Sequence, residues 1–300
     1  MKIGFAVPVT GSWATPANQL RIAERAEDLG YHSLWTLQRL LTPADSADET
    51  YRNVPDPLVT LAYLAGRTTR IRLGVAVLNL PFFSPALLAK QAATLDHVSD
   101  GRLDLGLGLG WMPEEFAAAG VPYERRGARA DEFLRALRAL WTEEISEFHG
   151  EFYDFPAVRM DPKPLQSPYP PLLLGGMSEP ALRRAGRLAD GWVSPSRADL
   201  GSIGTSIARV KTVAAEAGRD PAALRFVCRG VVRVRAEDQG PLTGSHQKIR
   251  SDLRALEEQG MTEVFLDLNF DPEVGGPHAD PAQSMRRAEE ALEALAPSLS

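Results

Sequence analysis

The stretch Pro171–Ser194, with the sequence PLLLGGMSEPALRRAGRLADGWVS, decides the fold. Its first residues, Pro171–Leu174, form an apolar run typical of a strand that is buried on both faces of a parallel sheet. A Gly-Gly turn and a Ser-Glu-Pro sequence follow, which is the usual chemistry of a helix N-terminus. The helical pattern over Glu179–Leu188 then leads to a second short apolar run at Gly191–Ser194. This order of elements predicts a βαβ unit with parallel strands.

The same alternation of apolar runs and amphipathic segments continues along all 300 residues. Strands are predicted at Lys2–Val9, Ser33–Leu37, Ile71–Leu78, Leu103–Leu109, Pro171–Leu174, Gly191–Ser194, Arg225–Val234 and Glu263–Leu268. Helices are predicted at Pro16–Leu29, Pro57–Arg67, Pro85–Val98, Arg126–Trp141, Glu179–Leu188, Gly201–Ala217, Gln247–Gln259 and Ala282–Leu295. Eight such pairs predict an α/β fold, a (β/α)8 TIM barrel that forms a single domain over residues 1–300. A doubly wound sheet with a second domain is the alternative, although no Gly-, Ser- or Pro-rich linker divides the chain.

Two irregular stretches interrupt this alternation. The first is an insertion after the fourth predicted helix, at about residues 143–170, where His149–Phe155 resembles a short hairpin and several prolines set an irregular path. The second, Ala236–Ser245, separates the seventh strand from its helix and could cover the barrel mouth. Long insertions of this kind usually form a lid or an interface.

Composition excludes several classes of protein. The net charge is −6, from 33 basic and 39 acidic residues, and the basic residues are not gathered into runs, which argues against a nucleic-acid partner. The single cysteine, Cys228, excludes an internal disulfide and a metal site built on cysteines, so a reducing, cytoplasmic setting is expected. The N-terminus lacks a signal-peptide pattern, and no apolar stretch approaches the ~20 residues of a membrane span.

Candidate site residues lie at the carboxyl ends of the strands, because the loops that follow the strands supply the reacting groups of a parallel barrel. Gln38 and Arg39 follow the second predicted strand, and Ala76, Val77 and Asn79 end the third. The histidines have no partner at a spacing typical of catalysis or metal binding, and no metal site is predicted.

Glycines mark two further strand ends. Gly106, Gly108 and Gly110 alternate with leucine, so one face of the fourth strand carries no side chain before Trp111. Either close packing inside the barrel or the approach of a flat ligand explains this face. The run Gly175-Gly176-Met177-Ser178 joins a strand directly to a helix, and it is either an anion site at the helix N-terminus or an ordinary tight turn.

A turn before the fourth strand is interpreted as structural. It comprises Ser99–Arg102, and Asp96 is expected to pair with Arg102 there.

Several motifs, in this order along the chain, resemble the bacterial luciferase-like monooxygenase superfamily, and most closely its branch that uses the deazaflavin coenzyme F420. The motifs are Ile71–Gly74, Leu88–Asp96, Ser99–Leu103, Gly106–Trp111 with Glu115, Arg126-Gly127 with Glu132, Leu140-Trp141, Gly175-Gly176 and Ala189–Trp192. Between coenzyme F420 and FMN these motifs discriminate poorly.

The resemblance implies a TIM barrel of the luciferase-like type with the ring of the cofactor in the barrel mouth. It also implies a non-prolyl cis peptide at Ala76–Val77, with Asn79 nearby, and a homodimer that acts on a small-molecule substrate. The expected cofactor-binding residues are Ala76, Val77, Asn79, Gly108, Gly110, Trp111, Arg126, Gly175, Gly176, Met177 and Ser178, of which Gly175 to Ser178 would hold the cofactor phosphate.

One position departs from the family pattern. Where relatives commonly carry an acidic residue followed by the acid/base histidine, this chain has Gln38 and Arg39. Arginine does not exchange a proton near neutral pH, although it can bind an anionic substrate or stabilise developing charge. The chemistry is therefore altered, or the proton comes from solvent, or the protein binds a cofactor without catalysis.

The function expected from these residues is hydride transfer between coenzyme F420 and a small organic substrate. An FMN-dependent luciferase-like monooxygenase and a non-catalytic flavin- or deazaflavin-binding protein are the alternatives. Gln38 and Arg39 are the candidate catalytic residues.

Overall fold

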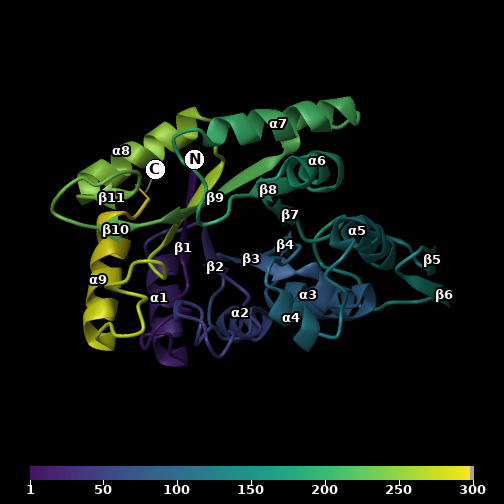
Figure 1. Ribbon diagram of the computed structural model, residues 1–300, viewed down its shortest axis with the longest axis horizontal. Helices are drawn as coiled ribbons and strands as arrows, with labels where there is room; N and C mark the ends of the chain where they lie inside the picture. Colours follow the sequence, from purple (N-terminus) through teal and green to yellow (C-terminus); the bar gives the residue numbers. More distant parts are fainter. Residues whose placement is uncertain (298–300) are drawn as a thin grey trace.

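The computed structural model describes residues 1–297, and its centre is a closed barrel of parallel strands (Figure 1). The strands are β1 (Lys2–Ala6), β2 (Ser33–Thr36), β3 (Arg72–Asn79), β4 (Leu103–Gly108), β7 (Leu172–Gly175), β8 (Gly191–Val193), β9 (Arg225–Val231) and β12 (Glu263–Asp267). They pair in the order β1-β12-β9-β8-β7-β4-β3-β2 and close between β2 and β1. The prediction of a (β/α)8 barrel is confirmed.

A helix follows each barrel strand and covers the outside of the barrel. These helices are α1 (Pro16–Asp28), α2 (Pro57–Ala65), α3 (Pro85–Val98), α5 (Arg126–Thr142), α6 (Glu179–Leu188), α7 (Ile203–Glu216), α8 (His246–Glu258) and α9 (Pro281–Ala294). Thr15, Asp56, Ser84, Ser245 and Asp280 cap five of them, each by accepting a hydrogen bond from a backbone N–H of the first turn. Figure 1 shows α1 and α9 side by side, where the first and last helices complete the ring.

Elements outside this pattern account for the differences from prediction. The helix α4 (Pro113–Ala118) lies in a segment where none was predicted. The hairpin of β5 (Ser146–His149) and β6 (Asp154–Val158) confirms a hairpin in the insertion, and it projects beyond α5 (Figure 1). The seventh predicted strand ends early, because its last residues form β10 (Arg233–Val234), which pairs with β11 (Thr243–Gly244).

The inside of the barrel is filled by side chains and is not a channel. Ala6, Trp35, Ala76, Leu173, Val193, Val227 and Phe265 form a buried layer across the axis. The rings of Trp35 and Phe265 stack with centroids 5.1 Å apart, an arrangement worth about 1 kcal/mol beyond simple burial. This layer separates the two ends of the barrel.

Below this layer, at the amino-terminal end of the strands, a network of buried charges closes the barrel. Asp104 accepts paired hydrogen bonds from Arg72, at 2.7 and 2.9 Å, and from Arg225, at 2.7 and 3.0 Å. Arg225 also reaches Glu263 at 2.9 Å. Burial raises the pKa of Asp104, but the two guanidinium groups lower it more, to about 2. Each charge in this network has a partner of opposite sign.

The expected pair between Asp96 and Arg102 does not form. The Arg102 guanidinium instead donates to Thr68 Oγ1 and to the carbonyl oxygens of Ala65, Thr68, Ile71 and Ser99, so it ties α2 to the start of β4. Asp96 accepts hydrogen bonds from the backbone and side chain of Gln166. Backbone carbonyl groups therefore take the place of the Asp96 carboxylate as partners of Arg102.

Two features considered above are absent from residues 1–297. None of their helices combines the length and apolar character needed to span a membrane. Within the same residues, no three His, Cys, Asp or Glu side chains are arranged to hold a metal ion.

Candidate active site

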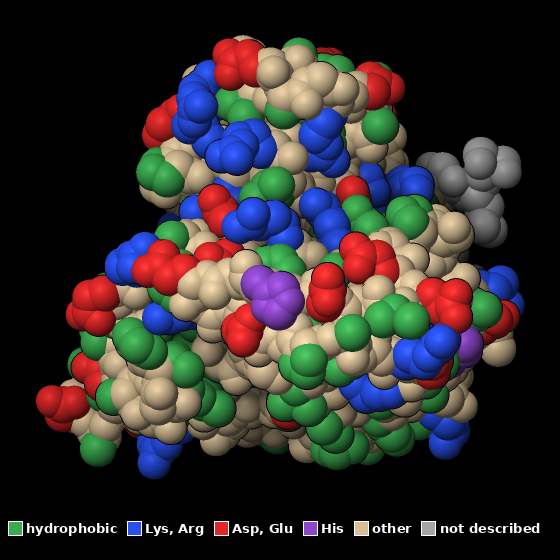
Figure 2. Space-filling view, turned by 90° about the vertical axis from the view of Figure 1, so that its right-hand side faces the viewer, with side chains coloured by type: hydrophobic (Ala, Val, Ile, Leu, Met, Phe, Trp, Pro, Cys, Tyr) green, Lys and Arg blue, Asp and Glu red, His purple; other side chains and the backbone are tan. Residues whose placement is uncertain are grey.

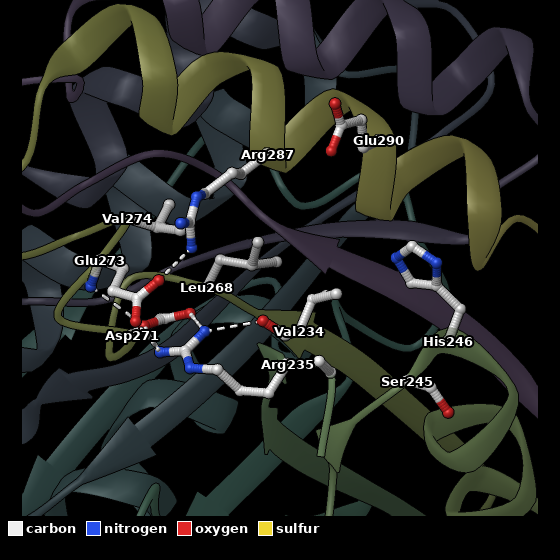
Figure 3. Close-up of a pocket in the computed structure, with 11 residues that line it drawn as sticks. Val234, Arg235, Ser245, His246, Leu268, Asp271, Glu273, Val274, Arg287 and Glu290 are labelled. Carbon is white, nitrogen blue, oxygen red and sulfur yellow. Dashed lines mark hydrogen bonds and ion pairs between the residues drawn. The ribbon is translucent and has the colours of Figure 1, made fainter. Parts of the chain in front are cut away.

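Two cavities compete as the functional site, and chemistry distinguishes them. The larger, of about 590 Å³, lies outside the barrel between β10, the start of α8 and α9 (Figure 3). Arg235 forms a paired salt bridge with Asp271, at 2.7 and 2.9 Å, and Arg287 pairs with Glu273. Those charges are already satisfied by one another. The stretch Ala236–Ser245 contributes to this cavity and not to the barrel mouth, contrary to expectation.

The second cavity, of about 360 Å³, occupies the barrel mouth at the carboxyl ends of the strands. It is lined by Leu37, Gln38, Arg39, Tyr51, Ala76, Val77, Asn79, Gly108, Leu109, Gly110, Trp111, Arg126, Gly175, Gly176, Ser178, Ala181, Val193, Ser194, Pro195, Ser196 and Arg229. Every predicted site residue is in this set except Met177, which is absent from the lining and exposed. We therefore take the mouth as the candidate active site.

One wall of the mouth is the end of β3. The Ala76–Val77 peptide bond is cis, as the family resemblance implies. The pairing of β3 with β4 shifts register between Val75 and Leu78, which surrounds this bond. Beyond it, the backbone N–H of Asn79 donates to Gln38 Oε1 at 2.7 Å, so Gln38 ties the end of β2 to the end of β3.

The glycines of β4 allow this wall to approach closely. A Cβ on Gly106 would lie 2.1 Å from the carbonyl oxygen of Val75, and one on Gly108 would lie 2.5 Å from Val77 Cγ2. Gly108 and Gly110 line the cavity, whereas Gly106 does not. Packing of β4 against β3 thus accounts for Gly106 and Gly108. These contacts support close packing inside the barrel, the first of the two interpretations of the glycine pattern.

Arg39 lies at the mouth in a buried ion pair. Its Nη1 is 2.9 Å from Glu115 Oε2, and the two side chains are only 6% and 1% exposed. The other Glu115 oxygen accepts the backbone N–H of Leu40 at 2.7 Å. The Arg39 guanidinium also lies 4.4 Å from the ring centre of Tyr51 and 5.0 Å from that of Trp111. Part of its hydrogen-bonding capacity is therefore used within the protein, and its role toward an anionic substrate stays a prediction.

Arg229, at the end of β9, is a site residue that sequence reasoning missed. Its Nη2 donates to the Ala76 carbonyl oxygen at 2.8 Å, and its Nε lies 3.2 Å from Asp267 Oδ2. Its guanidinium is also 5.6 Å from the Phe265 ring and 5.3 Å from the Phe270 ring. No local motif surrounds this arginine. The only signal in the sequence was a charged side chain inside the mainly apolar run of the seventh predicted strand, Arg225–Val234.

Ser194 and Cys228 lie beside Arg229. Ser194 Oγ accepts the Arg229 backbone N–H at 3.0 Å and donates to Cys228 Sγ at 3.6 Å. Cys228 is fully buried, and burial raises the pKa of its thiol to about 12. The thiol is therefore protonated near neutral pH and is a poor nucleophile.

Two strands along the barrel from β3, the mouth is bounded by the turn from β7 into α6. Gly176 has φ +122°, and a Cβ there would lie 2.7 Å from Ala181 Cβ, so both conformation and space favour glycine. Ser178 is the N-cap residue, but its side chain accepts no capping hydrogen bond. Arg126 lines the same side, stacks on Tyr123 at 4.0 Å and has no carboxylate partner among residues 1–297.

The side chains of the lining restrict its chemistry. Three of them are arginines, and none is Asp, Glu, His, Lys or Cys. Glu115 and Asp267 lie behind their arginines and outside the lining. The mouth can therefore hold anionic or carbonyl groups and a flat ring against Ala76 and Val77, but it lacks the side chains that bind metals.

Comparison with known proteins gives relatives over nearly the whole chain. The uncharacterized protein Rv0940c of Mycobacterium tuberculosis is 35% identical over 279 residues, which cover 89% of this chain and 90% of that protein. The FMNH(2)-dependent dimethylsulfone monooxygenase of Pseudomonas putida is 34% identical over 210 residues, which cover 69% of this chain and 56% of that enzyme.

Solved structures share the fold. The monooxygenase RslO1 from Streptomyces bottropensis has a TM-score of 0.83 at 25% identity and full coverage of both chains. An F420-dependent secondary alcohol dehydrogenase has a TM-score of 0.80 at 17% identity and 98% coverage of both chains. The family model described as luciferase-like monooxygenase matches residues 1–240. With the barrel, the cis peptide and the mouth residues described above, this match shows that the chain belongs to the luciferase-like monooxygenase family of flavin- and deazaflavin-dependent oxidoreductases.

Proposed function

We propose that this protein transfers a hydride between coenzyme F420 and a small organic substrate. The observation that carries the proposal is a lining that combines the apolar side chains of Ala76 and Val77 with the guanidinium of Arg126 and the helix start at Ser178. A flat redox ring fits the apolar side chains, and a phosphate on the tail of the cofactor fits the guanidinium and the helix start. The absence of acidic side chains from the lining favours such an anionic cofactor.

Several groups at the mouth have unused hydrogen-bonding capacity that a cofactor would satisfy. The backbone N–H groups of Ser178 and Glu179, at the start of α6, have no acceptor among the described residues. Among the described residues, the Arg126 side chain donates only one hydrogen bond, a long one of 3.4 Å to the Tyr123 carbonyl oxygen. Arg229 Nη1 likewise has no hydrogen-bond acceptor within residues 1–297. When bound, the deazaflavin would supply the hydride chemistry, and the protein would orient the ring and hold the tail.

Titration of the purified protein with coenzyme F420 and, separately, with FMN tests the proposal. We expect saturable binding of coenzyme F420, measured by the change in its fluorescence. Gly176→Val should weaken this binding at least tenfold, because a side chain there meets Ala181 and requires an unfavourable φ. Gly120→Val is the matched control, since Gly120 also has positive φ but has no atom near its Cβ position. Failure to bind either cofactor would refute the enzyme assignment.

The alternative is an FMN-dependent monooxygenase. Similarity to the Pseudomonas putida dimethylsulfone monooxygenase favours it. Tighter binding of FMN than of coenzyme F420, with oxygen consumed in the presence of reduced FMN, would replace the first proposal with this one. Cofactor binding without turnover by any electron donor or acceptor would instead indicate a non-catalytic binding protein.

We further propose a homodimer in the cytoplasm. Val59 and Tyr63 on α2 and Leu87 and Val98 on α3 are exposed, and Val59 is 70% accessible. Figure 2 shows apolar side chains along the lower edge of the molecule, which is the side where α2, α3 and α4 lie in Figure 1. Val59→Asp should shift the sedimentation coefficient toward the monomer. Ile145→Asp, at an exposed residue before the hairpin, is the control.

A further inference from the structure

The barrel mouth needs a source of protons, and the two residues at the usual acid/base position do not provide one. Gln38 carries an amide, and Arg39 keeps its proton. We propose that the phenol of Tyr51 is the proton donor of the mouth. This inference rests on the proposed function, because a proton is needed only when a substrate receives a hydride.

The composition of the lining leads to Tyr51 by elimination. Apart from hydrocarbon side chains and glycines, the lining consists of three arginines, Gln38, Asn79, Trp111, three serines and Tyr51. Amides and the indole do not act as acids, arginine does not release its proton, and serine hydroxyls are much weaker acids than a phenol. Tyrosine is among the side chains that serve as general acids in enzymes.

The position of Tyr51 suits this role. It lies in the long segment between β2 and α2, and its ring lies under the Arg39 guanidinium at 4.4 Å. On another side its ring meets Phe270 edge to face, with centroids 5.6 Å apart. These two contacts orient the ring, while the hydroxyl donates no hydrogen bond to any residue within 1–297. The hydroxyl is therefore available to a substrate in the cavity.

Charged groups lie close to the ring. Arg39 is held in place by Glu115, which does not line the cavity. The other charged groups near this segment are Arg229, which lies against Phe270, the pair Glu49–Arg52, and Asp48, which interacts with Arg39 and Arg197.

The proton of Tyr51 would be used in the reduction of a carbonyl substrate. The carbonyl carbon accepts a hydride, with its two electrons, that reduced coenzyme F420 would supply by breaking a C–H bond and becoming oxidised. The π electron pair of the C=O bond moves to oxygen. The Tyr51 O–H bond breaks as the proton passes to that oxygen, which gives an alcohol and a phenolate. Water from the open mouth then returns a proton to the phenolate, and the reverse reaction uses the same groups in the opposite order.

Tyr51→Phe tests this assignment, because it removes the hydroxyl and keeps the ring against Arg39 and Phe270. The assay follows oxidation of reduced coenzyme F420 with acetone, cyclohexanone, cyclohex-2-en-1-one and benzaldehyde as carbonyl probes. We expect kcat to fall at least 100-fold, within the range for loss of a general acid, with KM and the Kd for the coenzyme changed less than threefold. The alkaline decline of kcat in the wild type should be absent from the variant. Tyr153→Phe, at a half-buried tyrosine between β5 and β6 and outside the mouth lining, is the control and should behave as wild type.

Each other outcome has a distinct meaning. Wild-type kcat and an unchanged pH profile in Tyr51→Phe would overturn the assignment and leave the proposed function intact. Equal loss of coenzyme affinity would also overturn it, by placing Tyr51 in the cofactor site. Binding of the coenzyme without reduction of any carbonyl probe would overturn the carbonyl step and the donor together. Absence of coenzyme binding to the wild type would overturn the proposed function itself, and a thermal melt of each variant checks its folding.

Discussion

The two ends of the barrel use the same types of charged residue for different purposes. At the amino-terminal end, Asp104 is surrounded by Arg72 and Arg225, and each charge is matched by hydrogen bonds within the protein. At the mouth, Arg39 and Arg229 each have one carboxylate behind them and one face toward a cavity. The first arrangement leaves no capacity for a ligand, whereas the second does. Spare hydrogen-bonding capacity, and not charge itself, distinguishes a candidate site from a structural network.

The largest effect should come from breaking the network at the closed end. Asp104→Ala removes the carboxylate that both arginines share, which leaves Arg72 without a carboxylate partner and Arg225 with Glu263 alone. We expect a loss of about 4 kcal/mol in the free energy of unfolding, measured by urea denaturation. Asp45→Ala, at an exposed carboxylate, is the control and should change stability by less than about 0.5 kcal/mol. Similar effects at the two positions would contradict the structural role given to Asp104.

A somewhat smaller effect is expected at the mouth. Arg39→Met leaves Glu115 buried without its cation, although the carboxylate keeps the N–H of Leu40. The expected loss of stability is about 3 kcal/mol, and Arg39→Met combined with Glu115→Gln should recover part of it. If the single variant is as stable as wild type and loses only affinity for an anionic substrate, then Arg39 belongs to the substrate site and not to the scaffold.

Acid should weaken the closed end in a defined pH range. The folded-state pKa of Asp104, about 2, lies below the ordinary value of 3.8, so its stabilising contribution is complete above about pH 4 and disappears as the pH falls through 2. The shift corresponds to about 2 kcal/mol. Asp104→Asn should lack this component when unfolding free energies are compared between pH 4 and pH 2. The same pH dependence in the wild type and in Asp104→Asn would contradict this contribution of Asp104.

The smallest effect concerns ligand binding. Arg229→Met removes the guanidinium that holds the Ala76 carbonyl and faces the mouth. We expect about tenfold weaker binding of coenzyme F420, equivalent to about 1.4 kcal/mol, by fluorescence titration. Arg233→Met, two residues along the chain from β9 and outside the mouth lining, is the control. An unchanged Kd would show that Arg229 supports the barrel wall without acting on the ligand.

Much of the architecture was predictable because it depends on local chemistry. Apolar runs such as Leu172–Leu174 suit strands buried on both faces, and Asp56-Pro57 or Ser84-Pro85 are helix starts recognisable from neighbouring residues alone. The mouth residues at the ends of β2, β3, β4 and β7 were predictable for a related reason. Once the strands are parallel, their carboxyl ends converge at one edge.

Other features were not predictable, since they join segments far apart in the chain. Arg102 is bonded to carbonyls of α2 and the loop after it, and not to the nearby Asp96. Arg229 meets Ala76 across the barrel, although 153 positions separate them. The short helix α4 places Glu115 against Arg39, and this contact depends on how two loops fold over the mouth.

By itself, the sequence determined the order of strands and helices, the parallel barrel and the family, because periodicity, caps and motifs are properties of short stretches. Only the tertiary structure decided which charges cancel and which remain available. It covered Arg39 with Glu115, brought Arg229 to the mouth and left the Tyr51 hydroxyl free. The physical reason is that hydrogen bonds and ion pairs depend on distances of a few ångströms between side chains from distant segments, and closure of the barrel sets those distances.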